Sequence, residues 1–214
     1  MNLDTSKILG GIGAIIMFIG VIPYVNYFGV IELVGAILVL VALYGLGTYY
    51  RDGGIFKNAI YGLVTGIIGI VIAVAIAFTV ILANITDLLY QIFPGWNGDW
   101  TTLQGLTPDP NAFVGGDISA LFPFVIGAIA VLVIVWLSAI ISSFFFRRSF
   151  KQVTTKSTIG LFGTAGLLLL IGAFLTIIVI GFILMWIAAL ILAIAFFQLK
   201  PGQLETIPPP PNTV

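Results

Sequence analysis

The sequence contains no histidine and no cysteine. Imidazole acid–base catalysis, histidine-ligated haem, thiolate metal sites and disulfides are therefore excluded within this chain, and we expect no cofactor. Charge is scarce as well, since only 7% of the 214 residues are charged, whereas soluble domains carry roughly 25%. So few charges cannot cover a water-exposed surface. The formal net charge of zero also leaves no field that would attract nucleic acid.

The residues that are present suit a lipid environment. Apolar residues make up 60% of the sequence, which also holds 25 glycines and 17 phenylalanines, as expected where helices pack closely in hydrocarbon. We predict an all-α integral membrane helical bundle in residues 1–200, followed by a proline-rich cytoplasmic tail at 201–214. Six transmembrane helices, arranged as three hairpins, are expected at residues 8–25, 29–48, 58–85, 120–146, 160–178 and 181–199.

The basic residues predict how these spans are oriented. With six spans, all eight fall on one side of the membrane: Lys7, Arg51, Lys57, Arg147, Arg148, Lys151, Lys156 and Lys200. The opposite side includes an external loop at about residues 86–119 that contains no Lys or Arg. The positive-inside rule therefore places both termini in the cytoplasm of a multi-pass cell-membrane protein. Because no small-x-small cleavage pattern ends the first apolar run, we expect that run to be a retained helix.

The uncharged stretch from Ile159 to Leu199 would extend ~60 Å as one helix, about twice the ~30 Å hydrocarbon core. It must fold back, and the turn is expected near Thr176 to Gly181, where glycine can adopt the geometry of a tight reversal. A re-entrant hairpin that never reaches the far side is the alternative. A shift of 152 residues lays Gly20 and Gly29 onto Gly172 and Gly181. A parallel repeat of the first and last hairpins and chance identity both remain open.

Small residues in the third apolar segment predict close helix packing. Gly62, Gly66 and Gly69 recur at spacings of three and four and would share one helix face with Ala73 and Ala77. Packing within the chain is the favoured use of this face. The alternative is self-association or contact with another membrane subunit.

Glu32 is the one acid expected in or beside a hydrocarbon segment. A carboxylate inside the membrane is costly, so it is a candidate for binding a proton or a cation. The plainer interpretation is a carboxylate that reaches water at the outer interface, because no intramembrane Lys, Arg or His is available as its partner.

Polar motifs near the predicted ends of the spans are candidates for other roles. Arg147 and Arg148 lie where the fourth segment enters the cytoplasm, so they would contact anionic lipid head groups or simply fix the topology. Asn84 begins an Asn-Ile-Thr glycosylation pattern on the predicted outside. The proline run in 207–211 would offer a docking strip or belong to a disordered tail. Four loop aspartates could form a metal or enzyme site, although solvated loop acids are the ordinary explanation: Asp87, Asp99, Asp109 and Asp117.

Several motifs together resemble a known family. The opening at 5–13, the cytoplasmic stretch at 49–59, and the later stretches Phe146-Arg147-Arg148-Ser149-Phe150 and 161–167 are similar to the archaeal membrane proteins grouped as DUF996, a family of unknown function. The resemblance covers most of the chain outside the external loop and the tail. It implies an archaeal cell membrane and supplies no activity.

These observations favour a non-catalytic membrane protein. We expect an accessory or scaffold subunit of a membrane assembly or a lipid-interacting protein, with membrane lipids as partners. The alternative is a small transporter or channel, suggested by Glu32, the glycine-interrupted helices and the hairpin repeat.

Overall fold

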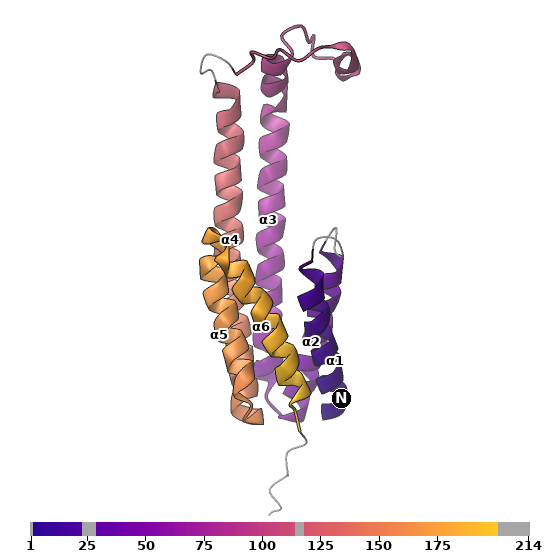
Figure 1. Ribbon diagram of the computed structural model, residues 1–214, viewed down its shortest axis with the longest axis vertical. Helices are drawn as coiled ribbons and strands as arrows, with labels where there is room; N and C mark the ends of the chain where they lie inside the picture. The colour runs from indigo at the N-terminus through magenta and orange to yellow at the C-terminus, as the bar shows by residue number, and fades with distance from the viewer. Residues whose placement is uncertain (1, 23–28, 114–117, 201–214) are drawn as a thin grey trace, which may run out of the picture. The chain divides into compact units, whose positions relative to one another are not determined.

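The structure is a computed structural model that describes residues 2–22, 29–113 and 118–200. Within these ranges it contains α-helices and short 3₁₀ helices and no strand (Figure 1), which confirms the all-α fold. The α-helices are α1 (Leu3–Gly20), α2 (Val30–Tyr49), α3 (Gly53–Ile92), α4 (Phe122–Ser157), α5 (Gly160–Leu175) and α6 (Ile180–Phe197). The 3₁₀ helices are η1 (Trp100–Gly105), η2 (Ser119–Leu121) and η3 (Thr176–Ile178). The predicted turn after the first span, Asp117 and the proline-rich tail lie outside the described residues.

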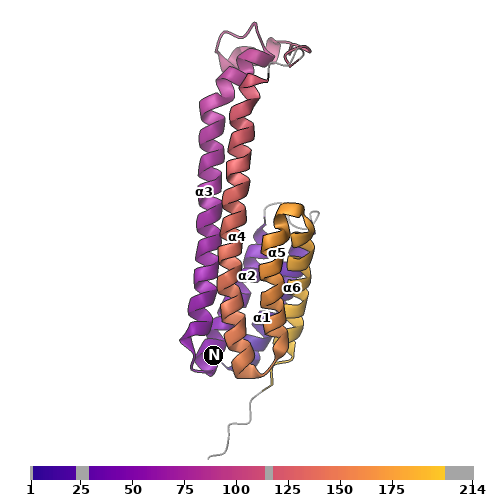
Figure 2. The same cartoon turned by 90° about the vertical axis from the view of Figure 1, so that its left-hand side faces the viewer.

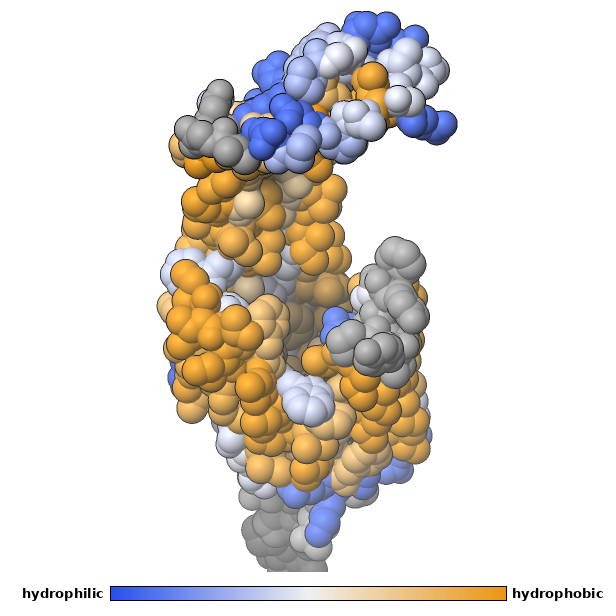
Figure 3. Space-filling view, turned by 45° about the horizontal axis from the view of Figure 1, so that its top comes forward, coloured by the Kyte–Doolittle hydropathy of each residue, from blue (hydrophilic) through white to orange (hydrophobic). Residues whose placement is uncertain are grey.

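Six segments of the described chain are long and apolar enough to cross a membrane. On the face seen in Figure 3, hydrophobic residues cover the flanks of the helices, whereas hydrophilic residues gather in the loop before η2. A surface of this kind is stable in hydrocarbon and not in water. The chain is therefore a multi-pass membrane protein, as its composition predicts.

Two helices are longer than their apolar runs. α3 has 40 residues and α4 has 36, which correspond to about 60 Å and 54 Å. α3 continues past the predicted end at residue 85, and α4 continues through the basic residues after Phe146. Hydropathy marks only the part of a helix that suits hydrocarbon, so it cannot show where the helix itself ends.

The chain divides into two compact units. The six-helix unit comprises Met1–Leu63 and Ser142–Val214, so it holds α1, α2, α5, α6, the start of α3 and the end of α4. The hairpin unit is Val64–Ile141, which contains the rest of α3 and α4 and the loop that joins them.

The core of the six-helix unit draws on all six helices. Its fully buried large side chains include Leu43 and Leu46 of α2, Ile55 of α3, Phe162 of α5 and Phe196 of α6. α1 lies beside both α2 and α6, and α5 lies beside α6 (Figures 1 and 2). The N-terminal and C-terminal hairpins therefore pack on each other within one core.

Glycines let the paired helices approach closely. A Cβ placed on Gly13 would lie 2.7 Å from the Gly35 carbonyl oxygen, and one on Gly35 would lie 2.6 Å from the Gly13 carbonyl oxygen. In the last hairpin, a Cβ on Gly172 would lie 2.9 Å from the Gly181 carbonyl oxygen. These crossings bring bare backbones together, as is common where lipid gives no hydrophobic drive to helix association.

Two side chains tie α1 to α6. At one end Lys7 Nζ donates a hydrogen bond to the Leu199 carbonyl oxygen at 3.1 Å. Toward the other end Trp186 Nε1 donates to the Phe18 carbonyl oxygen at 2.8 Å, and its ring stacks on Phe18. Both carbonyls lie near helix C-termini, where the helix itself supplies no donor.

The turn between α5 and α6 lies where it was predicted but is made differently. η3 occupies Thr176–Ile178, and the positive φ of 68° belongs to Val179, whereas Gly181 is already inside α6. The expectation that glycine supplies the turn geometry is therefore wrong. Gly181 is needed instead for the close approach to Gly172, which a larger residue would block.

Candidate functional site

The basic residues at the end of α4 face outward because the rest of the helix is held in the core. Ser149, Phe150 and Val153 are buried, with Val153 fully inaccessible, and Ser149 Oγ donates to the Ile55 carbonyl oxygen of α3 at 2.7 Å. At 3.6 residues per turn, Arg148 and Lys151 then lie on the side of the helix opposite these buried residues. Arg147, Arg148, Lys151 and Lys156 are all exposed.

A concave site of about 380 Å³ lies on this outward face. α4 contributes positions i, i+3, i+4 and i+7 of one helix face, and α3 contributes one residue across from them. The lining residues are Asn58, Arg148, Lys151, Gln152 and Thr155. We call this the basic pocket, and all of it belongs to the six-helix unit.

Hydrogen bonds fix the two amides of the basic pocket. Asn58 Nδ2 donates to Gln152 Oε1 at 3.2 Å and to the Gly54 carbonyl oxygen at 2.8 Å. Gly54 N–H in turn donates to Asp52 Oδ1 at 3.0 Å. This chain of bonds joins the start of α3 to α4, so the polar floor is formed before any ligand arrives.

The two cations of the basic pocket have no ionic partner in the described part of the chain. The Arg148 guanidinium lies 5.1 Å from the centroid of the Phe144 ring, an arrangement typical of a cation–π contact. Nearby, Lys57 Nζ lies 5.8 Å from the Tyr61 ring centroid. No acid is among the described residues that line the pocket. The described residues therefore leave its positive charge uncompensated.

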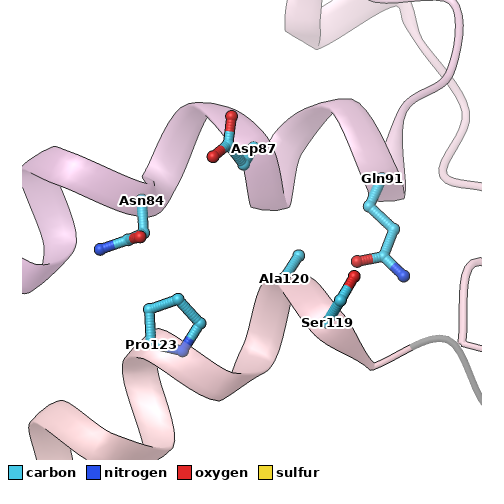
Figure 4. Close-up of a pocket in the computed structure, with 6 residues that line it drawn as sticks. All are labelled: Asn84, Asp87, Gln91, Ser119, Ala120 and Pro123. Carbon is cyan, nitrogen blue, oxygen red and sulfur yellow. The ribbon is translucent and has the colours of Figure 1, made fainter.

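A second concave site, of about 330 Å³, lies in the hairpin unit (Figure 4). α3 contributes Asn84, Asp87 and Gln91, and Ser119, Ala120 and Pro123 come from the start of the returning segment. Among the described lining residues, Asp87 is the one carboxylate. No group of three or more acidic, histidine or cysteine residues that could hold a metal ion occurs among the described residues.

Asn84, the predicted glycosylation acceptor, is a half-buried residue inside α3. Its Nδ2 donates to the Val80 carbonyl oxygen at 2.8 Å. For glycosylation to occur, this hydrogen bond would have to break and the Asn84 amide would have to become accessible to the glycosylating enzyme. Glycosylation of Asn84 therefore stays a prediction, and it requires this hydrogen bond to break.

Each of the predicted acids that the structure describes makes its own local contacts. Glu32 is half-buried in the first turn of α2, where its Cγ packs against Gly20. Asp99 accepts bonds from Thr101 N–H at 2.9 Å and Thr101 Oγ1 at 2.8 Å, so it caps η1, and these bonds lower the pKa of its carboxyl group. Asp109 accepts from Asn111 N–H at 2.8 Å. The described loop aspartates Asp99 and Asp109 thus support local turns.

The predicted packing glycines lie between α3 and α4. Gly62 is buried, and a Cβ there would lie 2.9 Å from the Phe146 ring, while the Gly62 carbonyl oxygen accepts from Ser142 Oγ at 2.8 Å. In the hairpin unit, Gly69 is buried against Ser138. Gly66 is half-buried.

Sequence reasoning singled out Arg147 and Arg148 but missed most of the basic pocket. The spacing of Arg148, Lys151, Gln152 and Thr155 is a signal that could have found the α4 side of it. Asn58 carried no such signal, because it comes from another helix 90 positions earlier than Arg148.

Comparison with known proteins supplies a family and no activity. The chain is 27% identical over 209 residues to an uncharacterized protein of Methanocaldococcus jannaschii, covering 96% of this chain and 97% of that protein. No solved structure matches the chain. The family model described as "Protein of unknown function (DUF996)" matches residues 31–190. The chain therefore belongs to the DUF996 family, as its sequence motifs predict.

Proposed function

We propose that this membrane protein is a non-catalytic, lipid-interacting structural protein that engages anionic head groups at the cytoplasmic surface of the cell membrane. The observation that carries the proposal is the outward basic face of α4, whose cations have no ionic partner among the described residues. Burial of Phe150 and Val153 fixes the rotation of the helix, so the cations cannot turn inward. The basic side chains therefore stay exposed to a partner of opposite charge.

The magnitude of this attraction is sufficient to matter. A basic residue beside an anionic membrane surface contributes roughly 1 kcal/mol. Four such residues on one helix end would therefore contribute about 4 kcal/mol at low salt, and less as salt shortens the Debye length to about 8 Å. The chain's zero net charge does not oppose this, because the interaction is local.

The use of polar side chains inside the bundle supports a non-catalytic role. Ser142, Ser149 and Trp186 each donate to a backbone carbonyl oxygen of a neighbouring helix. Such bonds use these side chains to join helices. The described residues likewise offer no cluster of metal ligands.

The test uses the full chain in vesicles of phosphatidylcholine with and without phosphatidylglycerol. Spin-labelled lipids report which head group is held beside the protein. We expect a preference for phosphatidylglycerol that weakens with salt, and that is lost when the four basic residues of α4 are changed to glutamine together. Equal occupancy by both lipids at low salt would reject the proposal.

A small transporter or channel is the second candidate, favoured by the position of Glu32. Its side chain packs against Gly20 in a predicted span, where a carboxyl group is costly unless it has a use. Flux into proteoliposomes that falls on Glu32→Gln would support it. A scaffold or accessory role would instead be supported by a partner that co-purifies at fixed stoichiometry from native membranes.

A further inference from the structure

We infer that the basic pocket is a specific site for the phosphate group of one anionic glycerophospholipid, an inference that rests on the proposed function and gives it a location. A diffuse basic surface attracts many lipids weakly. A pocket with fixed walls holds one head group in one place, so the two cases can be separated by experiment.

The charged groups match a phosphodiester. The Arg148 guanidinium presents N–H donors in a planar fork that fits two phosphate oxygens, and Lys151, one helical turn away, adds a compact ammonium charge. Neither has an ionic partner in the described chain, and none of the described lining residues is a carboxylate. A bound phosphate would therefore meet two positive charges without displacing an existing ion pair.

The floor of the pocket is fixed by Asn58. Both of its amide hydrogens are used, one toward Gln152 and one toward Gly54, so Asn58 is a positioning residue that holds the Gln152 side chain in place. Thr155 is held too, because its hydroxyl donates to the Lys151 carbonyl oxygen at 3.0 Å. A preformed floor lowers the ordering cost of binding.

The surroundings favour a lipid over free phosphate. The volume of about 380 Å³ exceeds what a bare phosphate needs and leaves room for glycerol. Phe144, beneath the Arg148 guanidinium, is 45% exposed, and Tyr61, which packs edge-on against Phe145, is also 45% exposed. Phe144 lies one turn from Arg148 and Tyr61 one turn from Lys57. These rings would contact the glycerol backbone and the first carbons of the lipid chains, which inorganic phosphate lacks.

The experiment is a titration of the detergent-solubilised full chain with phosphatidylglycerol or phosphatidylcholine, read by native mass spectrometry as lipids bound per chain. The pocket variant is Arg148→Gln with Lys151→Gln. The matched control, Arg147→Gln with Lys156→Gln, removes the same charge from the same helix outside the pocket. Circular dichroism and the unfolding midpoint in pure detergent show that both variants remain folded.

We expect one phosphatidylglycerol per wild-type chain, at least about tenfold weaker binding in the pocket variant, and a change of less than about threefold in the control. Equal weakening in both variants would overturn the site and leave the proposed function standing. No preference for phosphatidylglycerol in the wild type would overturn both. Displacement of the lipid by inorganic phosphate at matching concentration would overturn the assignment to a lipid.

Discussion

Replacing Gly35 by alanine should loosen the α1–α2 hairpin. The new Cβ would lie 2.6 Å from the Gly13 carbonyl oxygen and 2.8 Å from the Met17 backbone nitrogen. Both are backbone atoms, so neither can rotate away, and the helices must separate. Overpacking of this kind costs about 1–3 kcal/mol. Alanine gains about 1 kcal/mol over glycine inside a helix. The steric term is larger over most of its range, and we expect a net loss of up to about 2 kcal/mol.

The assay is reversible unfolding in mixed micelles of increasing SDS fraction, followed by tryptophan fluorescence and circular dichroism. Gly13→Ala should behave like Gly35→Ala, because its Cβ would lie 2.7 Å from the Gly35 carbonyl oxygen. The control is Gly160→Ala, where no atom lies within 4 Å of the added carbon. We expect the control to be neutral or slightly stabilising. A Gly35→Ala protein as stable as the Gly160→Ala protein would refute the close-packed crossing.

Three further predictions concern other contacts. Trp186→Phe keeps an aromatic ring for stacking but removes the N–H that donates to the Phe18 carbonyl oxygen, so the same unfolding assay should show a loss of about 1 kcal/mol; an unchanged midpoint would show that this bond contributes nothing. Hydrogen bonds from Thr101 lower the pKa of Asp99 in the folded protein, so the stabilisation of η1 is present above the unfolded pKa of about 3.9 and is lost as pH falls through the folded pKa. Fluorescence of Trp96, whose indole donates to the Asp99 carbonyl oxygen, should therefore change only in acid, and Asp99→Asn should remove that change; a wild-type-like transition in the variant would assign it to another group. The exposed apolar turn between α5 and α6 is expected to end inside the hydrocarbon, so a cysteine replacing Ile178 should resist water-soluble thiol reagents added from either side of the membrane. Labelling from the outside would show that this turn reaches the outer surface.

The helices could be predicted from the sequence because each contains a long apolar run bounded by polar residues. Their ends and their contacts could not. Gly181 illustrates why, since a glycine near a turn suggests positive φ, yet the structure uses it for packing and places the strain at Val179. The glycines matched by the 152-residue shift also differ in use. Gly172 and Gly181 pack on each other, whereas Gly29 caps α2 with φ of 70° and no neighbour within 4 Å.

Only part of the candidate site could be predicted from the sequence, because contacts between helices leave no local pattern. Arg148 stands out because a charge is rare in this chain, and one face of α4 can be read from spacing alone. The Asn58–Gln152 bond joins residues that are 94 positions apart. Pairing of this kind depends on which helices become neighbours, and neither hydropathy nor periodicity carries that information.

The segregation of basic residues cannot decide how deeply the α5–α6 hairpin enters the bilayer, because a crossing hairpin and a re-entrant one leave both ends on the same side. The structure adds two observations. The turn exposes Ile177 and Val179, each at 69%, and its one hydroxyl, on Thr176, donates back to the Ala173 carbonyl oxygen. A Cβ on Gly166 of α5 would lie 3.1 Å from the Cα of Arg147, so the basic end of α4 runs alongside the start of α5. From Gly166 the hairpin rises about 18 Å to its turn, short of the ~30 Å hydrocarbon core. Both observations favour a turn that ends among the hydrocarbon chains of the lipids.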